Sequence, residues 1–198
     1  MPTLQLTRKT PSERLGKILA YILSAPVMAL ILVFIVSATL LKEMESSWPW
    51  VGVTTLFVSF IPLAGYLIPQ FLKTTKKNRR IQRRISFLSS LISFSLGAVT
   101  LWLANAPRIL MIITFCYVAV CYSLAFVNLF YKASGHAAGV AGPAVIYLFL
   151  YGLKALPVLI LIPLIMWARV KEQEHSFGQT VVGAIISAFA TFLVIRLL

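Results

Sequence analysis

Residues 109–131 read ILMIITFCYVAVCYSLAFVNLFY, a run of 23 residues without a charged side chain that is bounded by Arg108 and Lys132. About 20 apolar residues cross the hydrocarbon layer of a bilayer as a helix, so this run predicts a membrane-spanning helix. Further uncharged runs lie at 18–41, 46–72, 85–107, 133–153, 155–168 and 175–195. The sequence therefore predicts an all-α fold, a polytopic membrane helical bundle with about seven transmembrane helices, or six as the alternative.

The alternative depends on the run 155–168, which has only 14 residues. As an α-helix it would rise about 21 Å, less than the thickness of the hydrocarbon layer. Lys154 and Arg169 flank it, and their long side chains can reach the polar interfaces and make up the difference. We count it as a span. The turns between the runs are brief, which predicts a single integral membrane domain over residues 1–198.

The composition agrees with a membrane protein, because 60% of the residues are hydrophobic and only 12% are charged. A soluble domain has about 45–50% apolar and about 25% charged residues. All five acidic residues are glutamates. The lack of aspartate excludes the aspartate-rich motifs with which membrane prenyltransferases and CDP-alcohol transferases hold magnesium and pyrophosphate. The two cysteines, Cys116 and Cys121, exclude a disulfide framework or a zinc site.

The net charge of +13 is distributed unevenly between the two faces of the predicted bundle. With seven spans, one face holds only Lys42, Arg108, Lys154 and Arg196. By the positive-inside rule the richer face is cytoplasmic, and such a face also attracts anionic headgroups. The richer face carries 14 cations, namely Arg8, Lys9, Arg14, Lys17, Lys73, Lys76, Lys77, Arg79, Arg80, Arg83, Arg84, Lys132, Arg169 and Lys171.

The chain has two histidines, His136 and His175, and with seven spans both lie at helix ends on the basic face. A single histidine in a membrane protein is usually a structural hydrogen-bonding residue. Two imidazoles among cations suit a nucleophile and an acid that act on a phosphate. If 155–168 did not cross, the two rings would lie on opposite faces, about 30 Å apart, and would not cooperate.

Small residues surround His136, since nine of the twelve residues from 133 to 144 are Ala, Ser or Gly. Such residues allow close packing of helix backbones. Ser134 and Gly135 would in addition place a hydroxyl and unobstructed N–H groups at a helix N-terminus, where anions bind. Gln179 lies four residues after His175, one helical turn further on the same face, where it can orient the ring. A solvated polar loop is the other interpretation of residues 169–179.

These residues resemble two motifs of the type 2 phosphatidic acid phosphatase (PAP2) superfamily. Its signature is Lys, six residues, Arg-Pro; then Pro-Ser-Gly-His; then Ser-Arg, five residues, His, three residues, Asp. Ser134-Gly135-His136 matches the second motif, and the spacings from Arg169 to His175 and from His175 to Gln179 match the third. The resemblance covers about 73–198, and the compact form is similar to prokaryotic isoprenoid-lipid phosphatases, archaeal ones included.

The chain departs from this signature where Ala133 replaces a proline, Ala168 a serine and Gln179 the aspartate. No register of the first motif is followed by proline, and a topogenic cluster explains most of its charge without catalysis. We favour the register Lys77–Arg84, because it puts Arg84 at the start of a predicted span. The three registers are Lys73–Arg80, Lys76–Arg83 and Lys77–Arg84.

The resemblance implies a metal-independent mechanism through a phosphohistidine. His175 would attack phosphorus, and His136 would protonate the departing oxygen and then activate water. Gln179 would fix the tautomer of His175 but would stabilise the imidazolium less than a carboxylate does, and Glu172 or Glu174 are candidates for the missing charge. The residues implied in phosphate binding are Lys77, Arg84, Arg169, Ser134 and Gly135, assisted by Lys132 or Arg80.

We therefore expect a membrane lipid phosphatase acting on a lipid phosphate or diphosphate, with an isoprenoid (polyprenyl) lipid as the preferred substrate class. The alternative is a non-hydrolytic protein of the same kind that binds or transports anionic lipids. Gln179 favours this alternative, whereas the two histidines argue against it. The expected partners are the phosphorylated lipid and the bilayer, with no cofactor, no metal and no nucleic acid. The active site would face the cytoplasmic side of the cell membrane.

Overall fold

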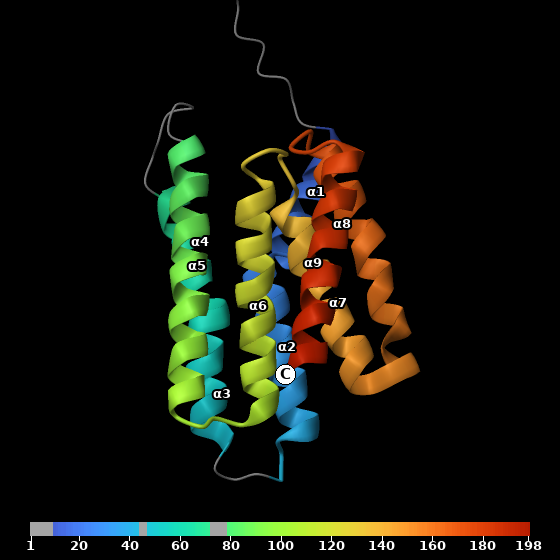
Figure 1. The fold of residues 1–198 in the computed structure, drawn as a ribbon. Coiled ribbons are helices and arrows are strands. Elements are labelled where there is room, and N and C mark those ends of the chain that lie inside the picture. The colour runs from blue at the N-terminus through green and yellow to red at the C-terminus, as the bar shows by residue number, and fades with distance from the viewer. Residues whose placement is uncertain (1–9, 44–46, 72–78) are drawn as a thin grey trace, which may run out of the picture.

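A computed structural model describes residues 10–43, 47–71 and 79–198. All regular secondary structure in these ranges is helical, so the all-α prediction is confirmed (Figure 1). The helices, in chain order, are α1 (Pro11–Ile22), α2 (Ala25–Leu40), α3 (Trp48–Thr55), the π-helix η2 (Leu56–Phe60), α4 (Ile61–Phe71), α5 (Arg79–Leu103), α6 (Arg108–Val127), α7 (Gly135–Tyr151), the 3-10 helix η4 (Gly152–Ile160), α8 (Leu161–Lys171) and α9 (Phe177–Leu197).

Helical elements long and apolar enough to cross a membrane number five in the described ranges, or six if the bent pair α1 and α2 is one span. The expected seven spans are therefore not seven separate helices. Residues 135–171, predicted as two spans, form one helical element of 37 residues. Helical structure continues through Lys154, the charge that separates the two predicted spans. The five elements are Trp48–Ile68, Arg84–Leu103, Arg108–Val127, Gly135–Lys171 and Phe177–Leu197.

The element Gly135–Lys171 turns back on itself. Helix α7 is capped by Gly152 with φ 59° and ψ −141°, a conformation that is open almost only to glycine. Helices η4 and α8 then return toward the end where α7 begins (Figure 1). The segment 175–179 touches both ends of the element: the Ser134 amide, just before α7, donates to the Gln179 carbonyl at 2.9 Å, and the His175 amide donates to the Arg169 carbonyl near the end of α8 at 3.4 Å.

The returning arm is longer than its residue count suggests. It consists of nine residues of 3-10 helix in η4 and 11 residues of α-helix in α8. A 3-10 helix rises about 2.0 Å per residue and an α-helix about 1.5 Å, so the arm has a contour length of about 34 Å. That length is sufficient for a hydrocarbon layer of about 30 Å.

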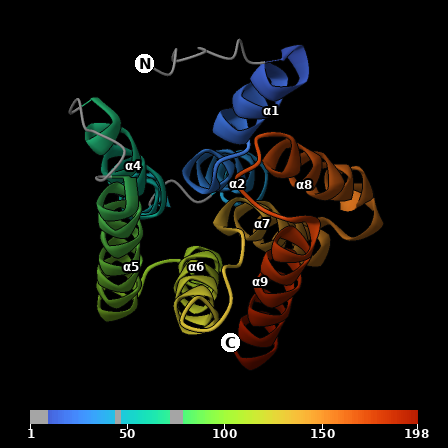
Figure 2. The same cartoon turned by 90° about the horizontal axis from the view of Figure 1, so that it is seen from above.

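The bend of 47° between α1 and α2 follows from Pro26 at the start of α2. The proline ring clashes with the carbonyl four residues earlier, which belongs to Ile22, the last residue of α1. Helix α1 lies beside α8 (Figure 2). A Cβ on Gly16 would lie only 3.0 Å from the Ala168 carbonyl oxygen, so α1 supports the segment that carries Arg169.

Two serines of α5 hold η2 and α4 in place. The Phe57 carbonyl lies in a π-helix, where its partner would be residue 62, which is Pro62 and has no N–H. The Ser93 hydroxyl donates to this carbonyl at 2.6 Å. The Gly65 carbonyl lies four residues before a second proline, and the Ser86 hydroxyl donates to it at 2.8 Å. Side chains of α5 thus satisfy carbonyls that the prolines leave without a helical donor.

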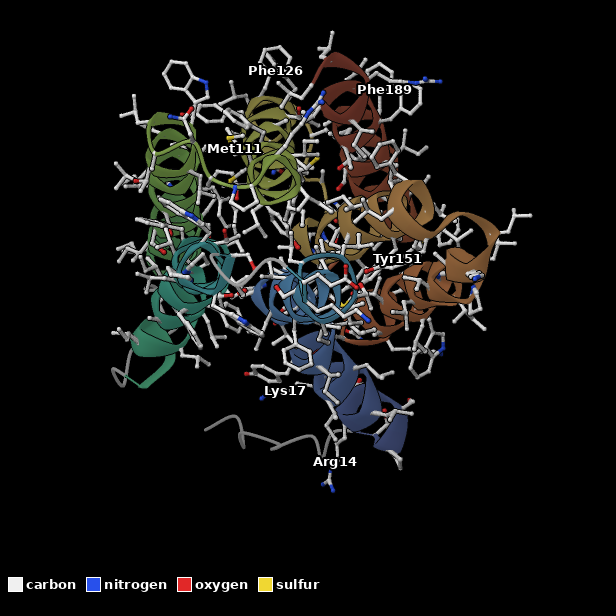
Figure 3. All side chains as sticks on the ribbon, turned by 90° about the horizontal axis from the view of Figure 1, so that it is seen from below. Arg14, Lys17, Met111, Phe126, Tyr151 and Phe189 are labelled. Atoms are coloured by element: carbon white, nitrogen blue, oxygen red, sulfur yellow. The ribbon has the colours of Figure 1, made fainter. Side chains whose placement is uncertain are left out.

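Helix α7 occupies the centre of the bundle, next to α2, α8 and α9 (Figure 2). Ten of its 17 residues are buried. Gly139 lies so close to α2 that a Cβ there would collide with it, and the Ser187 hydroxyl of α9 donates to the Ala138 carbonyl at 2.7 Å. The expected packing role of the small residues is confirmed. Large apolar side chains such as Phe126 and Phe189 project outward (Figure 3).

Candidate active site

Ser134 caps the N-terminus of α7. Its Oγ accepts a hydrogen bond from the Ala137 amide at 3.4 Å, and the residue is fully buried. Gly135 is exposed, and nothing lies within 4 Å of the position that a Cβ would take. The first turn of α7 therefore presents backbone N–H groups beside open space, which suits an anion.

His136 follows in the same turn of α7 and is half-buried. Its ring meets the Tyr66 ring of α4 edge-on, with the centroids 6.3 Å apart. Tyr66 in turn meets Tyr21 of α1 at 6.1 Å, and Lys17 Nζ lies 5.7 Å from the Tyr21 centroid. No sequence pattern predicted these contacts, because they join helices that are far apart in the chain.

Gln179 links the cap of α9 to His175. Ser176 is the N-cap, and its Oγ accepts from the Gln179 amide at 3.3 Å. Gln179 Oε1 accepts from the Ser176 amide at 3.2 Å and lies 3.1 Å from His175 Nδ1. Because an amide oxygen only accepts, Nδ1 donates to it, and in the neutral ring Nε2 then carries the lone pair. The expected contact between His175 and Gln179 is present.

The segments that carry the two histidines are joined directly. The Ser134 amide donates to the Gln179 carbonyl at 2.9 Å, and Lys132 Nζ donates to the Glu174 carbonyl at 2.9 Å. Both connections lie at the upper end of the bundle in Figure 1. The structure therefore brings the beginning of α7 and the beginning of α9 together.

Arg169 lies in the last turn of α8, and its carbonyl accepts from the His175 amide at 3.4 Å. Only 9% of the residue is exposed, and its Nη1 forms an ion pair with the Glu172 carboxylate. Its Nε is buried and has no hydrogen-bond partner among the described residues. Sequence reasoning treated Glu172 as a possible source of charge for His175 and missed the pair with Arg169. The spacing of three residues, which places both on one helix face, is the signal that would have found it.

Most of the first basic motif lies outside what the structure describes. Lys77 lies outside the described residues, and of Arg80 only the backbone, in the first turn of α5, is described. Arg84 is exposed on α5, and α6 stands between α5 and α9 in both views (Figures 1 and 2). The role expected for Arg84 in phosphate binding stays a prediction.

Within the described ranges, no three His, Cys, Asp or Glu side chains come together as metal ligands. A pocket of about 210 Å³ lies at the opposite end of the bundle, where it is lined by Ile35, Tyr147, Tyr151, Lys154, Ala155 and Val158. It is remote from both histidines. The junction of α7 and α9 thus brings helix N-terminal N–H groups near an imidazole whose tautomer is set, and the backbone of Arg169 is bonded to the same segment through the His175 amide.

Comparisons with known proteins find no relative of this chain. No protein-family model matches it, and neither a curated protein nor a solved structure is similar to it.

Proposed function

We propose that this protein is a membrane lipid phosphatase that hydrolyses a lipid phosphate or diphosphate, with a polyprenyl lipid as the preferred substrate class. The observation that carries the proposal is the Arg169 guanidinium, which is nine-tenths buried and has an unpartnered Nε among the described residues. An unsatisfied buried donor on a cation favours a bidentate anion such as phosphate. His175 stands six residues further on and is oriented by Gln179.

The chemistry needs two proton carriers and no electron transfer. His175 Nε2 attacks phosphorus, the bond from phosphorus to the lipid oxygen breaks, and the leaving oxygen takes a proton from His136. His136, now neutral, removes a proton from water, which attacks the phosphohistidine and releases inorganic phosphate and His175. Arg169, Lys132 and the N–H groups at Ser134 and Gly135 stabilise the charge on the phosphoryl oxygens. The capped first turn of α7 and the open space at Gly135 support this role.

We further infer seven passages through the membrane, with α1 and α2 as one and the two arms of Gly135–Lys171 as two. Both histidines then share one face. The described cations at that face are Arg14, Lys17, Arg84, Lys132, Arg169 and Lys171, against Lys42, Arg108, Lys154 and Arg196 at the other. This asymmetry supports a cytoplasmic site. The polyprenyl substrate class rests on the resemblance of the two motifs to the phosphatidic acid phosphatase superfamily.

The second candidate is a non-hydrolytic protein that binds or transports anionic lipids. Gln179 favours it, because a neutral amide stabilises an imidazolium less than a carboxylate does. The same amide oxygen also caps α9 by accepting from Ser176, so a purely structural reason exists for its presence. The tautomer that Gln179 imposes on His175 favours the phosphatase, since a lipid-binding site has no need of a nucleophile.

Measuring phosphate release by the purified protein would distinguish the phosphatase from the lipid-binding or lipid-transport protein. The panel comprises polyprenyl phosphate, polyprenyl diphosphate, phosphatidate and phosphatidylglycerophosphate, each in detergent with EDTA. We expect release from at least one lipid, fastest from a polyprenyl substrate and undiminished by the chelator. His175→Ala, purified identically, controls for a contaminating phosphatase. Folded protein that binds these lipids without releasing phosphate would favour the second candidate, and release that requires added magnesium would contradict the histidine mechanism.

A further inference from the structure

The turn at Gly152 leaves a hollow in the side of the bundle. At this residue the chain turns away from the axis of α7, and η4 then packs against α7 and α8. A pocket of about 210 Å³ remains between α2, α7 and η4. Tyr151 lies where these three elements meet (Figure 3). Because the pocket lies at the end of the bundle remote from the histidines, it is not part of the proposed active site.

The walls of this pocket are apolar and fixed in position. Ile35 of α2 faces Ala155 and Val158 of η4 across it. The Tyr151 hydroxyl lies 2.6 Å from Thr39 Oγ1, which itself donates to the Ile35 carbonyl at 2.7 Å. Since a hydroxyl has one proton, Tyr151 is the donor in its bond to Thr39. This bond holds the Tyr151 ring against α2, so the pocket is preformed.

Lys154 places a positive charge at the edge of the pocket. It lines the pocket and is exposed, and no acidic side chain pairs with it within the described ranges. Other cations at this end of the bundle are engaged. Arg108 donates to the Leu198 carbonyl, and the Arg196 guanidinium lies 5.3 Å from the centroid of the Phe192 ring. An apolar pocket with an unpaired cation at its edge is complementary to an amphiphile that has a negative headgroup.

The size and lining of the pocket indicate which part of an amphiphile enters it. Pockets that enclose a whole drug-sized ligand have roughly 300–1,000 Å³, so about 210 Å³ accommodates only a segment of a chain. Water is a poor occupant, because it needs two to four polar partners and the walls are apolar. A hydrocarbon segment therefore fits inside, while its headgroup stays outside at Lys154.

We propose that this pocket binds an anionic phospholipid of the surrounding bilayer. A segment of one acyl chain lies between Ile35 and Val158, and the phosphodiester group lies at the Lys154 ammonium. The bound lipid fills the gap between α2 and η4 and so supports the returning arm of Gly135–Lys171. The proposal is independent of lipid hydrolysis, since it concerns the opposite end of the bundle.

The test locates the lipid by cross-linking. Full-length protein in maltoside micelles is irradiated with phosphatidylglycerol that carries a diazirine in one acyl chain, and the labelled peptides are mapped. Lipids at the basic face label other peptides, so they do not obscure the result. We expect labelling of residues 152–160, displaced about fivefold better by unlabelled phosphatidylglycerol than by phosphatidylcholine with the same chains, since one cation near the headgroup contributes about that factor.

Two kinds of variant separate the charge from the hollow. Lys154→Gln should abolish the preference for phosphatidylglycerol, and Lys154→Arg should restore it. Arg196→Gln is the matched control, because it removes one charge from the same end of the bundle outside the pocket, and it should behave like the wild type. Val158→Phe, which fills the pocket and keeps Lys154, should lose the labelling of residues 152–160. If Val158→Phe does not fold, Ile35→Trp fills the pocket from α2 and should have the same effect.

Three results would overturn the proposal. They are the absence of label from residues 152–160, equal displacement by the two lipids in the wild type, and an unchanged preference in Lys154→Gln. Phosphate release by the same preparation is a separate measurement. Hydrolysis without this labelling would leave the phosphatase standing and refute the lipid site, and labelling without hydrolysis would do the reverse.

Discussion

The Ser134 amide nitrogen and the Gln179 carbonyl oxygen, 45 residues apart in the chain, are joined by a hydrogen bond of 2.9 Å. This bond ties the first turn of α7 to the first turn of α9. Gly183 makes the approach possible, because a Cβ there would collide with the Ser134 carbonyl and lie 3.0 Å from its nitrogen. The two histidine segments are therefore held together by backbone atoms.

Gly183→Ala should push α9 away from Ser134. We expect a loss of about 1–3 kcal/mol in unfolding free energy, typical of overpacking against a rigid neighbour, together with a lower rate of phosphate release. Gly52→Ala is the control, since nothing lies within 4 Å of its added Cβ. Thermal unfolding in detergent and the release assay check both variants. Equal behaviour of the two alanine variants would show that the close approach is unimportant.

Gln179→Leu should lower kcat, because it removes the acceptor of both His175 Nδ1 and the Ser176 amide. Gln179→Glu keeps that acceptor and adds a charge that stabilises the imidazolium, so it should preserve or raise kcat. Ser176→Ala removes only the cap, at a cost of about 1 kcal/mol in stability, and should spare kcat. Steady-state rates and melting temperatures separate the two effects. Wild-type kcat in Gln179→Leu would refute the orienting role.

His175→Ala should abolish turnover and the covalent intermediate, since it removes the proposed nucleophile. His136→Ala should reduce hydrolysis of a lipid alkyl phosphate far more than that of an aryl phosphate, because acid catalysis matters most for a basic leaving group. Acid-quenched incubation with radiolabelled substrate, followed by peptide mapping, locates the adduct. A labelled residue other than His175 would refute the mechanism in which His175 is the nucleophile.

Single cysteines at Phe130, Ser176, Ala104 and Leu153 should report the path of the chain, in a background with Cys116 and Cys121 replaced by alanine. All four positions are exposed. We expect an impermeant maleimide to reach the first two from the cytoplasm and the last two from outside. Labelling of Leu153→Cys together with Phe130→Cys from the same side would contradict an out-and-back path of Gly135–Lys171.

Ser93→Ala should destabilise the protein by about 1–2 kcal/mol, because it leaves the Phe57 carbonyl of η2 without a donor inside the membrane. Ser90→Ala is the matched control, since Ser90 donates only to a carbonyl of its own helix, at 3.0 Å. Its effect should stay within about 0.5 kcal/mol. Denaturant unfolding in mixed micelles measures the difference. Similar losses in both variants would argue against the cross-helix bond.

Local sequence patterns predicted most of the helical fold. They failed where a proline breaks a helix inside an uninterrupted apolar run. The turn at 105–107 separates α5 from α6 as its polar and proline residues indicate. Within the uncharged run 18–41, however, Pro26 breaks the helix, since it removes a backbone donor and adds a clash. Near Lys154 the predicted boundary is close to the observed one, since α7 ends at Tyr151 and the chain turns at Gly152, although 3-10 helix follows at once and continues through Lys154.

At the site, contacts within one helical turn were predictable and contacts between helices were not. The spacing of four residues indicated the bond between His175 and Gln179, which is present. Neither the packing of α6 between α5 and α9 nor the contact of Gly183 with Ser134 leaves a trace in local sequence, because both depend on how whole helices pack.

The nine-residue 3-10 stretch of η4 allows the length of the returning arm to change, because a 3-10 helix is longer per residue than an α-helix. Rewinding it into α-helix would shorten the arm by about 4 Å. Biological membranes differ in hydrocarbon thickness by a few ångströms. A change in the length of η4 around Pro157, at the end of the bundle remote from the histidines, can therefore compensate for hydrophobic mismatch. The junction of α7 and α9 then keeps its position relative to the membrane surface. Infrared helix signatures recorded in short-chain and long-chain bilayers would reveal this interconversion, and an unchanged 3-10 content across both would exclude it.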